Sequence, residues 1–257
     1  MSVALVTGAA GGLGAAVASR LVEEHAVLLT DVDAGHLEKI ASKLAANGAR
    51  VAHTVCDVSE RASVQAAFAV AEEQLGEVTA LANVAGVGKF TPFAELTEEQ
   101  WDRTFAVNTR GTFLTCQELV HRRAGRPGAI VNIASIGARL GMEAIAHYGS
   151  SKAAVIELTH VVARVGAPSG LRANAVMPGL IWTDMWRATT ESLIANDPAH
   201  ADATPEQLFA GFVEQMVPMG RPQVPADIAE MVAFLLSEKA VNITGQTIAV
   251  DGGAVMT

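Results

Sequence analysis

The chain has 257 residues, of which 50% are hydrophobic and 18% are charged, compared with about 25% charged in an average soluble protein. A chain of this length and composition can bury a large core, which excludes disordered, collagen-like and disulfide-scaffold proteins. Its 18 basic and 27 acidic residues give a net charge of −9. That charge repels phosphate backbones and anionic lipids, so neither nucleic acid nor a membrane is an expected partner.

Cysteine, histidine and hydropathy patterns predict a cytoplasmic protein without a metal site. Cys56 and Cys116 form no CxxC pair, which is typical of free thiols in a reducing compartment. No apolar run reaches the ~18 residues of a membrane span, and the N-terminus lacks the basic start of a signal peptide. The seven histidines form no HExxH motif and no His/Cys pairing, so we expect no bound metal.

In chain order, short apolar runs alternate with segments of helical hydrophobic spacing. The runs predict strands at residues 2–7, 26–30, 50–55, 79–82, 129–133, 171–177 and 246–250. The spacing predicts helices at residues 12–24, 37–44, 64–75, from about 98, 148–162 and 228–235. Alternation of this kind indicates parallel βαβ units, and strands that are apolar throughout indicate a sheet covered on both faces. We therefore expect a single-domain, doubly wound (Rossmann) α/β sheet over residues 1–257.

Two segments depart from this regular alternation. Gly166 lies where the helix that carries Tyr148 would continue, and a glycine inside a helix costs about 1 kcal/mol, so we expect that helix to end early. Residues 184–216 are rich in Ala, Thr, Asp and Glu. They are either a surface excursion or a substrate lid, because long connections in a compact domain are often functional.

The first strand is followed by a glycine-rich turn, Thr7-Gly8-Ala9-Ala10-Gly11-Gly12-Leu13-Gly14. Glycines here let backbone N–H groups approach a pyrophosphate at the start of the next helix. The spacing is GxxxGxG rather than the literal GxGxxG, and glycines also serve ordinary strand-to-helix turns. Because the turn follows the first strand and precedes an amphipathic helix, we interpret it as a dinucleotide site that includes Gly8, Gly12, Leu13 and Gly14.

Asp31 ends the second strand and predicts which dinucleotide binds. A carboxylate at this place can accept hydrogen bonds from the adenosine ribose, and it would repel a 2′-phosphate. No Lys or Arg stands at Ala9, Ala10 or Val32, so we expect NAD rather than NADP. The simpler alternative is that Asp31 only forms the turn at the strand end.

Tyr148 is the only tyrosine, and Lys152 follows it at the i, i+4 spacing that places both on one helix face. A nearby ammonium, with an oxidised nicotinamide ring, would lower the pKa of the phenol and let it exchange a proton with an alcohol or ketone. As an isolated pair, the two residues are more often a packing tyrosine and a solvated lysine.

Polar or small residues also follow three other predicted strands. Ser135 comes after the fifth strand, Asn83-Val84-Ala85-Gly86 after the fourth and Pro178-Gly179 after the sixth. The carboxyl ends of parallel strands are where doubly wound sheets bind ligands. We therefore expect these groups at one rim, with the Ser135 hydroxyl able to polarise a substrate carbonyl.

With these motifs in order, the chain resembles the short-chain dehydrogenase/reductase family over essentially its whole length. The motifs are TGAAGGLG, Asp57-Val58, NVAG, Asn108, Ser135, Tyr148-xxx-Lys152, Pro178-Gly179 and the terminal TGQ…VDGG. The resemblance implies that Tyr148 is the acid/base, that Ser135 orients the substrate oxygen and that Lys152 binds the nicotinamide ribose. It implies a proton-relay water held by Asn108. It also implies cofactor contacts from Asp57, Val58, Asn83, Ala85, Gly86, Pro178, Gly179, Ile181 and Thr183.

The resulting prediction is an NAD-dependent oxidoreductase that acts on a secondary alcohol or ketone. Trp182, Met185 and Trp186, together with Met142, suggest a hydrophobic or ring-bearing substrate, although the tryptophans could instead pack the lid onto the body. An NADPH-dependent 3-oxoacyl-thioester reductase and a non-catalytic NAD-binding protein are the alternatives. The resemblance further implies a homotetramer.

Overall fold

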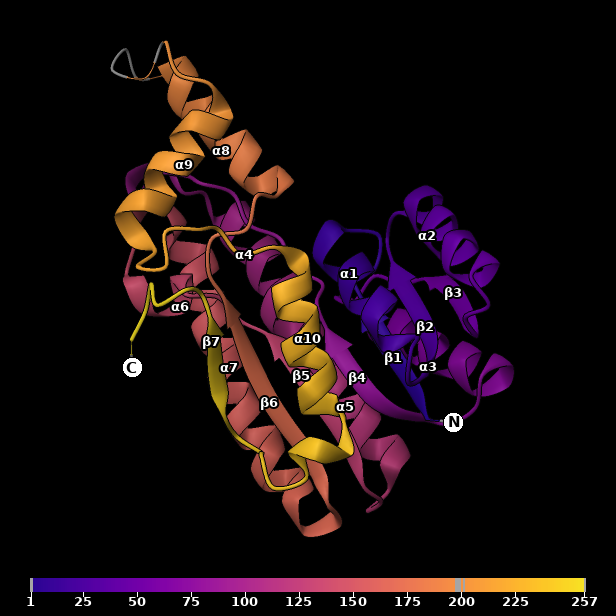
Figure 1. Cartoon of the computed structure of the whole chain (residues 1–257). Helices are drawn as coiled ribbons and strands as arrows, with labels where there is room; N and C mark the ends of the chain where they lie inside the picture. Colours follow the sequence, from indigo (N-terminus) through magenta and orange to yellow (C-terminus); the bar gives the residue numbers. More distant parts are fainter. Residues whose placement is uncertain (1, 197–199, 201, 257) are drawn as a thin grey trace.

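The computed structural model describes residues 2–196, 200 and 202–256, and its strands form one parallel seven-stranded sheet (Figure 1). The strands are β1 Val3–Thr7, β2 Ala26–Asp31, β3 Val51–Val55, β4 Val78–Asn83, β5 Gly128–Ile133, β6 Leu171–Pro178 and β7 Thr247–Val250. Their order in the sheet is β3-β2-β1-β4-β5-β6-β7. The predicted doubly wound parallel sheet is confirmed.

Helices cover both faces of this sheet. The helices on the two faces are α1 Gly12–Leu21, α2 Ala34–Ala46, α3 Arg61–Gln74, α5 Gly111–Arg123, α7 Ala146–Gly166 and α10 Pro225–Leu236. One core lies between the sheet and α1, α2 and α10, and the other between the sheet and α3, α5 and α7. Ala4 and Val6 of β1 enter the first core, whereas Val3 and Leu5 enter the second. The strand is apolar throughout because successive side chains point to opposite, equally buried faces.

The segment predicted as a long helix from about residue 98 is three joined pieces. The capping box of Thr97 and Gln100 starts α4, Glu98–Phe105, and a π-helical segment, Ala106–Arg110, connects it to α5. The π-helical turn inserts an extra residue, so Asn108 is redirected relative to a regular helix.

The helix that carries Tyr148, α7, reaches past Val162 and ends at Gly166. The glycine is therefore its last residue and not part of its interior. A Cβ on Gly166 would lie 2.6 Å from both the carbonyl oxygen and a methyl carbon of Leu171. The glycine permits close packing of the helix end on β6.

Residues 184–216 form two helices rather than an irregular loop. They are α8 Asp184–Asn196 and α9 Pro205–Met216; residues 197–199 and 201 of this segment lie outside the described part. Thr204 and Gln207 form a capping box, and Pro205 occupies the first turn of α9. Figure 1 shows both helices beyond one end of the sheet, apart from the two helical layers.

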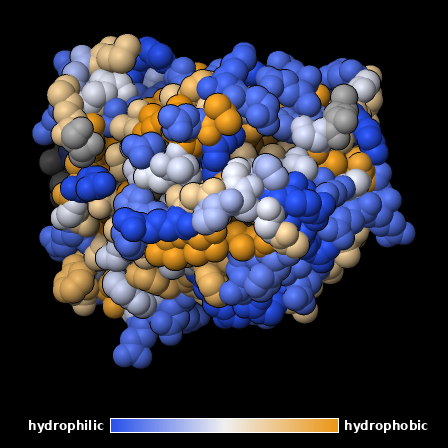
Figure 2. Space-filling view, turned by 90° about the horizontal axis from the view of Figure 1, so that it is seen from below, coloured by the Kyte–Doolittle hydropathy of each residue, from blue (hydrophilic) through white to orange (hydrophobic). Residues whose placement is uncertain are grey.

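The order of the strands places a switch point between β1 and β4, whose connections lead to opposite sides of the sheet. Ligands of doubly wound sheets bind at the carboxyl ends of the strands beside such a point. Viewed from below, the molecule is largely hydrophilic with a hydrophobic band across the middle (Figure 2). Among the described residues, the helices are too short or too polar to cross a bilayer.

Candidate active site

The glycine-rich turn lies at the switch point. Its glycines differ in what a side chain at each position would contact. Gly8 has φ of +68°, and a Cβ there would lie 2.7 Å from the Cα of Ala85. A Cβ on Gly14 would collide with the carbonyl oxygen of Gly8. A Cβ on Gly12 would meet nothing within 4 Å, so the protein's own packing does not require this glycine. An open glycine at a helix N-terminus fits the close approach of a pyrophosphate.

Asp31 connects this turn to the end of β2. Its Oδ2 accepts a hydrogen bond of 3.0 Å from the Ala10 N–H, and its Oδ1 accepts one of 3.0 Å from the Asp33 N–H. The turn-forming alternative therefore has a structural basis. A carboxylate retains further lone pairs after two such bonds, so it can still accept from a ribose hydroxyl.

The expected adenine contacts differ in exposure. Asp57 is exposed, and its Oδ1 accepts hydrogen bonds from the N–H and the hydroxyl of Ser59. Val58 is buried, and a Cβ on Gly111 would lie 2.7 Å from its Cγ2. Val58 is therefore mainly part of the core under α5.

The Asn83 side chain is hydrogen-bonded inside the fold. Its Nδ2 donates to Asn132 Oδ1 at 2.9 Å, and its Oδ1 accepts from the Thr115 hydroxyl at 2.7 Å. These bonds join β4 to β5 and α5, and the expected cofactor contact of Asn83 stays a prediction. Ala85 donates its N–H to the Thr7 hydroxyl.

Asn108 lies in the π-helical turn and is fully buried. Its side chain accepts a hydrogen bond from the Val87 N–H and donates to the Val87 carbonyl, each at 2.8 Å. It also donates to the Ser151 hydroxyl, which in turn donates to the Tyr148 carbonyl at 2.7 Å. Asn108 thus joins the loop after β4 to the helical turn that carries Tyr148.

The structure brings Ser135, Tyr148 and Lys152 together beside Gly86. Ser135 and Tyr148 line the same cavity, and the Ser135 hydroxyl lowers the pKa of the Tyr148 phenol. The Lys152 Nζ donates to the Ile133 carbonyl at 2.8 Å and lies 5.8 Å from the centre of the Tyr148 ring. A Cβ on Gly86 would lie 3.2 Å from that Nζ.

Burial controls the ionisation of this group. It lowers the pKa of Lys152 from 10.5 to about 8. It also raises the pKa of Tyr148, and the neighbouring Ser135 hydroxyl offsets only part of that rise. Without a nucleotide, the pKa of the phenol is therefore raised; the lowered pKa is predicted with an oxidised nicotinamide ring beside Tyr148, and it stays a prediction. Desolvation outweighs a cation that lies over the ring rather than against the oxygen.

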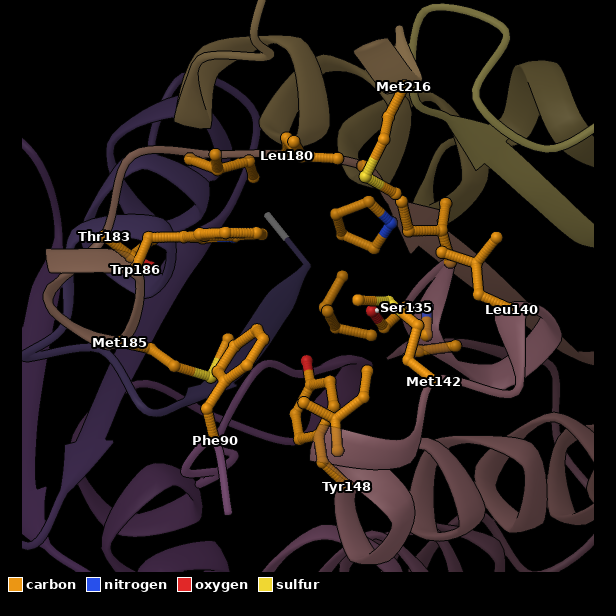
Figure 3. Close-up of a pocket in the computed structure, with 18 of the residues that line it drawn as sticks. Phe90, Ser135, Leu140, Met142, Tyr148, Leu180, Thr183, Met185, Trp186 and Met216 are labelled. Atoms are coloured by element: carbon orange, nitrogen blue, oxygen red, sulfur yellow. Dashed lines mark hydrogen bonds between the residues drawn. The ribbon is translucent and has the colours of Figure 1, made fainter. Parts of the chain in front are cut away.

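A cavity of about 140 Å³ opens above Tyr148 (Figure 3). Five of the predicted cofactor residues line it, namely Leu13, Pro178, Gly179, Ile181 and Thr183. Ser135 and Tyr148 also line it, as do three predicted substrate residues, Met142, Met185 and Trp186.

Trp182 is the exception among the predicted substrate residues, because it does not line this cavity. Its ring lies 5.0 Å from that of Phe209, and the guanidinium of Arg187 stacks over it. The packing alternative is correct for Trp182.

Sequence reasoning missed several apolar lining residues: Phe90, Ile136, Leu140, Ile145, Leu180 and Met216. Phe90 lies shortly after the NVAG motif in the chain. Its position could therefore have indicated that it lies close to the site. Met216 carried no such signal, since it ends α9 far along the chain.

The cavity wall also fits a nicotinamide. The Thr183 hydroxyl is buried and has no hydrogen-bond partner, although a buried polar atom normally has one. Lys152 has three N–H donors, and one of them is used by Ile133. Both groups can serve a polar ligand that enters beside Gly179.

A family model described as enoyl-(acyl carrier protein) reductase matches residues 8–255. The chain is 37% identical over 256 residues to D-threitol dehydrogenase of Mycolicibacterium smegmatis, covering 98% of this chain and 92% of the relative. It is 34% identical over 258 residues to the short-chain dehydrogenase/reductase eriH of Hericium erinaceus, covering 98% and 96%.

Two solved structures share the whole architecture. One is NAD+-bound xylitol dehydrogenase, with a TM-score of 0.91, 31% identity and coverage of 98% of each chain. The other is a variant of actinorhodin polyketide ketoreductase with NADPH, with a TM-score of 0.89, 32% identity and coverage of 98% and 97%.

Proposed function

The chain belongs to the short-chain dehydrogenase/reductase family of nicotinamide-linked oxidoreductases that act on alcohols and ketones, and we propose that it transfers hydride between NAD(H) and a secondary alcohol or ketone. The observation that carries this proposal is that Ser135 and Tyr148 line one cavity, while the Lys152 Nζ lies 5.8 Å from the centre of the Tyr148 ring. When bound, the nicotinamide would supply the hydride acceptor or donor.

The preference for NAD over NADP rests on Asp31. Its carboxylate lies against the glycine-rich turn, where a 2′-phosphate would meet a like charge at a cost of several kcal/mol. Gly12 would admit the pyrophosphate, and Thr183 and Lys152 would hold the nicotinamide end. Comparing activity with NADH and NADPH tests this assignment. A preference for NADPH would instead support a 3-oxoacyl-thioester reductase.

Tyr148 is the proposed acid/base. Because burial raises its pKa, the phenol is protonated at neutral pH and can donate that proton to the oxygen of a ketone. In the opposite direction it accepts the proton of the alcohol. The Ser135 hydroxyl, which accepts a hydrogen bond from the Gly137 N–H at 3.1 Å, can donate its own hydrogen to the same substrate oxygen.

Lys152 and Asn108 support this proton transfer. The Lys152 ammonium lies at the end of β5, close enough to favour the phenolate when the proton has left. Asn108 keeps the loop after β4 and the Tyr148 turn in register through Val87 and Ser151. A relay water beside Asn108 remains part of the proposal.

Replacing Tyr148 by phenylalanine tests catalysis directly. The variant should bind NAD as the parent does, because only the hydroxyl is removed, and should lose at least about a hundredfold in kcat. Nucleotide binding is measured by calorimetry and turnover by the absorbance of the reduced nicotinamide. Unchanged turnover would refute the role of Tyr148, and bound nucleotide without turnover in the parent protein would favour a non-catalytic binding protein.

We also keep three predictions that extend beyond the reaction. They are a single domain with residues 184–216 as its lid, a homotetramer, and a cytoplasmic location. Sedimentation equilibrium of the purified chain tests the tetramer, and limited proteolysis with and without NAD tests whether residues 184–216 close over the site.

A further inference from the structure

The cavity beside Tyr148 is almost free of polar side chains away from the reacting oxygen. Its hydroxyl groups are those of Ser135, Tyr148 and Thr183, and none of its lining residues is charged. The first two would contact the substrate oxygen, and Thr183 lies toward the expected nicotinamide. The indole N–H of Trp186 is the one other polar hydrogen on a lining side chain, and it can donate but not accept.

Three methionines form much of the wall around the space left for a substrate. Met142 precedes α7, Met185 lies in α8 and Met216 ends α9. Figure 3 shows these side chains on different sides of the cavity, with Phe90 and Trp186 on the same side as Met185. Methionine is flexible and polarizable, so such a wall adapts to the shape of an apolar group but offers only weak acceptors to a hydroxyl.

The lid maintains this apolar wall. Trp186 packs against Phe90 with ring centres 5.4 Å apart, and against Phe209 and Phe212 of α9 at 5.3 and 5.4 Å. Phe90 belongs to the loop after β4, so these contacts join both lid helices to the body beside the cavity. A hydroxyl on a substrate held here would lose water and gain no partner of equal quality.

We propose that the substrate is an uncharged ketone or secondary alcohol whose remaining groups are alkyl, aryl or carbocyclic, and that Met142, Met185, Met216 and Trp186 make the enzyme discriminate against polyols. This inference rests on the proposed hydride transfer and defines its substrate class. Two similar proteins, D-threitol dehydrogenase and xylitol dehydrogenase, are named for polyol substrates. The substrate class proposed for this chain differs from theirs.

A pair of ketones with the same shape tests polarity without interference from size. 4-Methylcyclohexanone and 4-hydroxycyclohexanone differ only by a methyl or a hydroxyl group remote from the carbonyl. With NADH, kcat/KM should be higher for the methyl compound by about fivefold to a hundredfold, the range expected for an unpaired buried hydroxyl. Equal efficiency, or a preference for the hydroxyl compound, would overturn the proposal.

A matched pair of variants connects the preference to the wall. Met142→Gln places an amide in the cavity at similar volume, so the preference for the methyl compound should fall at least about threefold, mainly through KM. Met219→Gln is the control, because Met219 is 68% exposed and does not line the cavity, and it should retain the parent preference. An unchanged preference in Met142→Gln would refute the role of that side chain.

The two proposals fail in different ways. Faster reduction of hydroxylated ketones would overturn the substrate class and leave hydride transfer intact. If NADH binds and no ketone is reduced, the proposed function fails, and the wall is then tested by calorimetric binding of the same two ketones. Tighter binding of the hydroxyl compound would overturn the substrate class in that case as well.

Discussion

Replacing Lys152 with methionine should stabilise the nucleotide-free protein at neutral pH while abolishing its proposed function. Lys152 is 3% exposed, and burial lowers its pKa from 10.5 to about 8. Folding must therefore bury a charge that the unfolded chain keeps in water. Methionine has a similar length and no charge, so it removes this penalty.

The magnitude follows from the two pKa values. A pKa of 10.5 in the unfolded chain and of about 8 in the folded chain corresponds to a penalty of about 3 kcal/mol at pH 7 and about 2 kcal/mol at pH 9. Losing the hydrogen bond to the Ile133 carbonyl offsets about 1 kcal/mol of the gain. The expected net stabilisation is thus about 2 kcal/mol at pH 7.

The sign of the pH dependence is a sharper test than the magnitude. Between pH 8 and 10.5 the unfolded chain binds more protons at this lysine than the folded chain does, so the parent protein gains stability as pH rises. The variant lacks this group. Its advantage over the parent should therefore decrease by about 1 kcal/mol between pH 7 and pH 9.

Urea denaturation without nucleotide at pH 7, 8 and 9 measures these differences. Lys43→Met is the matched control, because Lys43 is exposed on α2 and its removal should change stability by less than about 0.5 kcal/mol. If Lys152→Met is less stable than the parent at pH 7, or if its advantage grows with pH, the desolvation argument is wrong.

Four further substitutions test separate parts of the structure. Gly12→Ala should leave the free energy of unfolding unchanged or slightly higher and weaken NAD binding by at least about tenfold in calorimetry, since its Cβ meets no protein atom; Gly14→Ala should destabilise the fold itself, because its Cβ collides with the carbonyl of Gly8. Asn83→Ala should lower the urea midpoint, with a loss of about 2–4 kcal/mol from its buried network, and unchanged stability would contradict the internal role of this side chain. Arg172→Met should cost about 2–4 kcal/mol in the same assay, because it leaves the Leu235 and Ser237 carbonyls at the end of α10 without their donor; a loss below about 1 kcal/mol would show that water replaces it.

The local pattern of the sequence was sufficient for the fold and for part of the site. Strand and helix periods are set by neighbours along the chain, so the alternation of apolar runs predicted the parallel sheet. The same holds for the glycine-rich turn and for the shared helix face of Tyr148 and Lys152, because each of these features is formed by residues close together in the chain. Their positions at the carboxyl ends of the strands followed from the rule for doubly wound sheets.

The remaining features depended on residues that are distant in the chain. The Asn83 side chain is hydrogen-bonded to Asn132 and Thr115, and the Trp182 ring packs against Phe209. Met216 lines the cavity because the tertiary structure places the end of α9 beside Ser135 and Tyr148.

The ionisation of Tyr148 and Lys152 also depends partly on the local sequence and partly on the tertiary structure. The i, i+4 spacing places an ammonium beside a phenol, but it does not determine how much water either group loses when the chain folds. The packing around α7 removes that water, lowers the pKa of Lys152 and raises that of Tyr148. Amino-acid order along the chain therefore brought the two groups to one helical face, while contacts from the rest of the folded molecule set the protonation of each, because desolvation sums over all surrounding atoms.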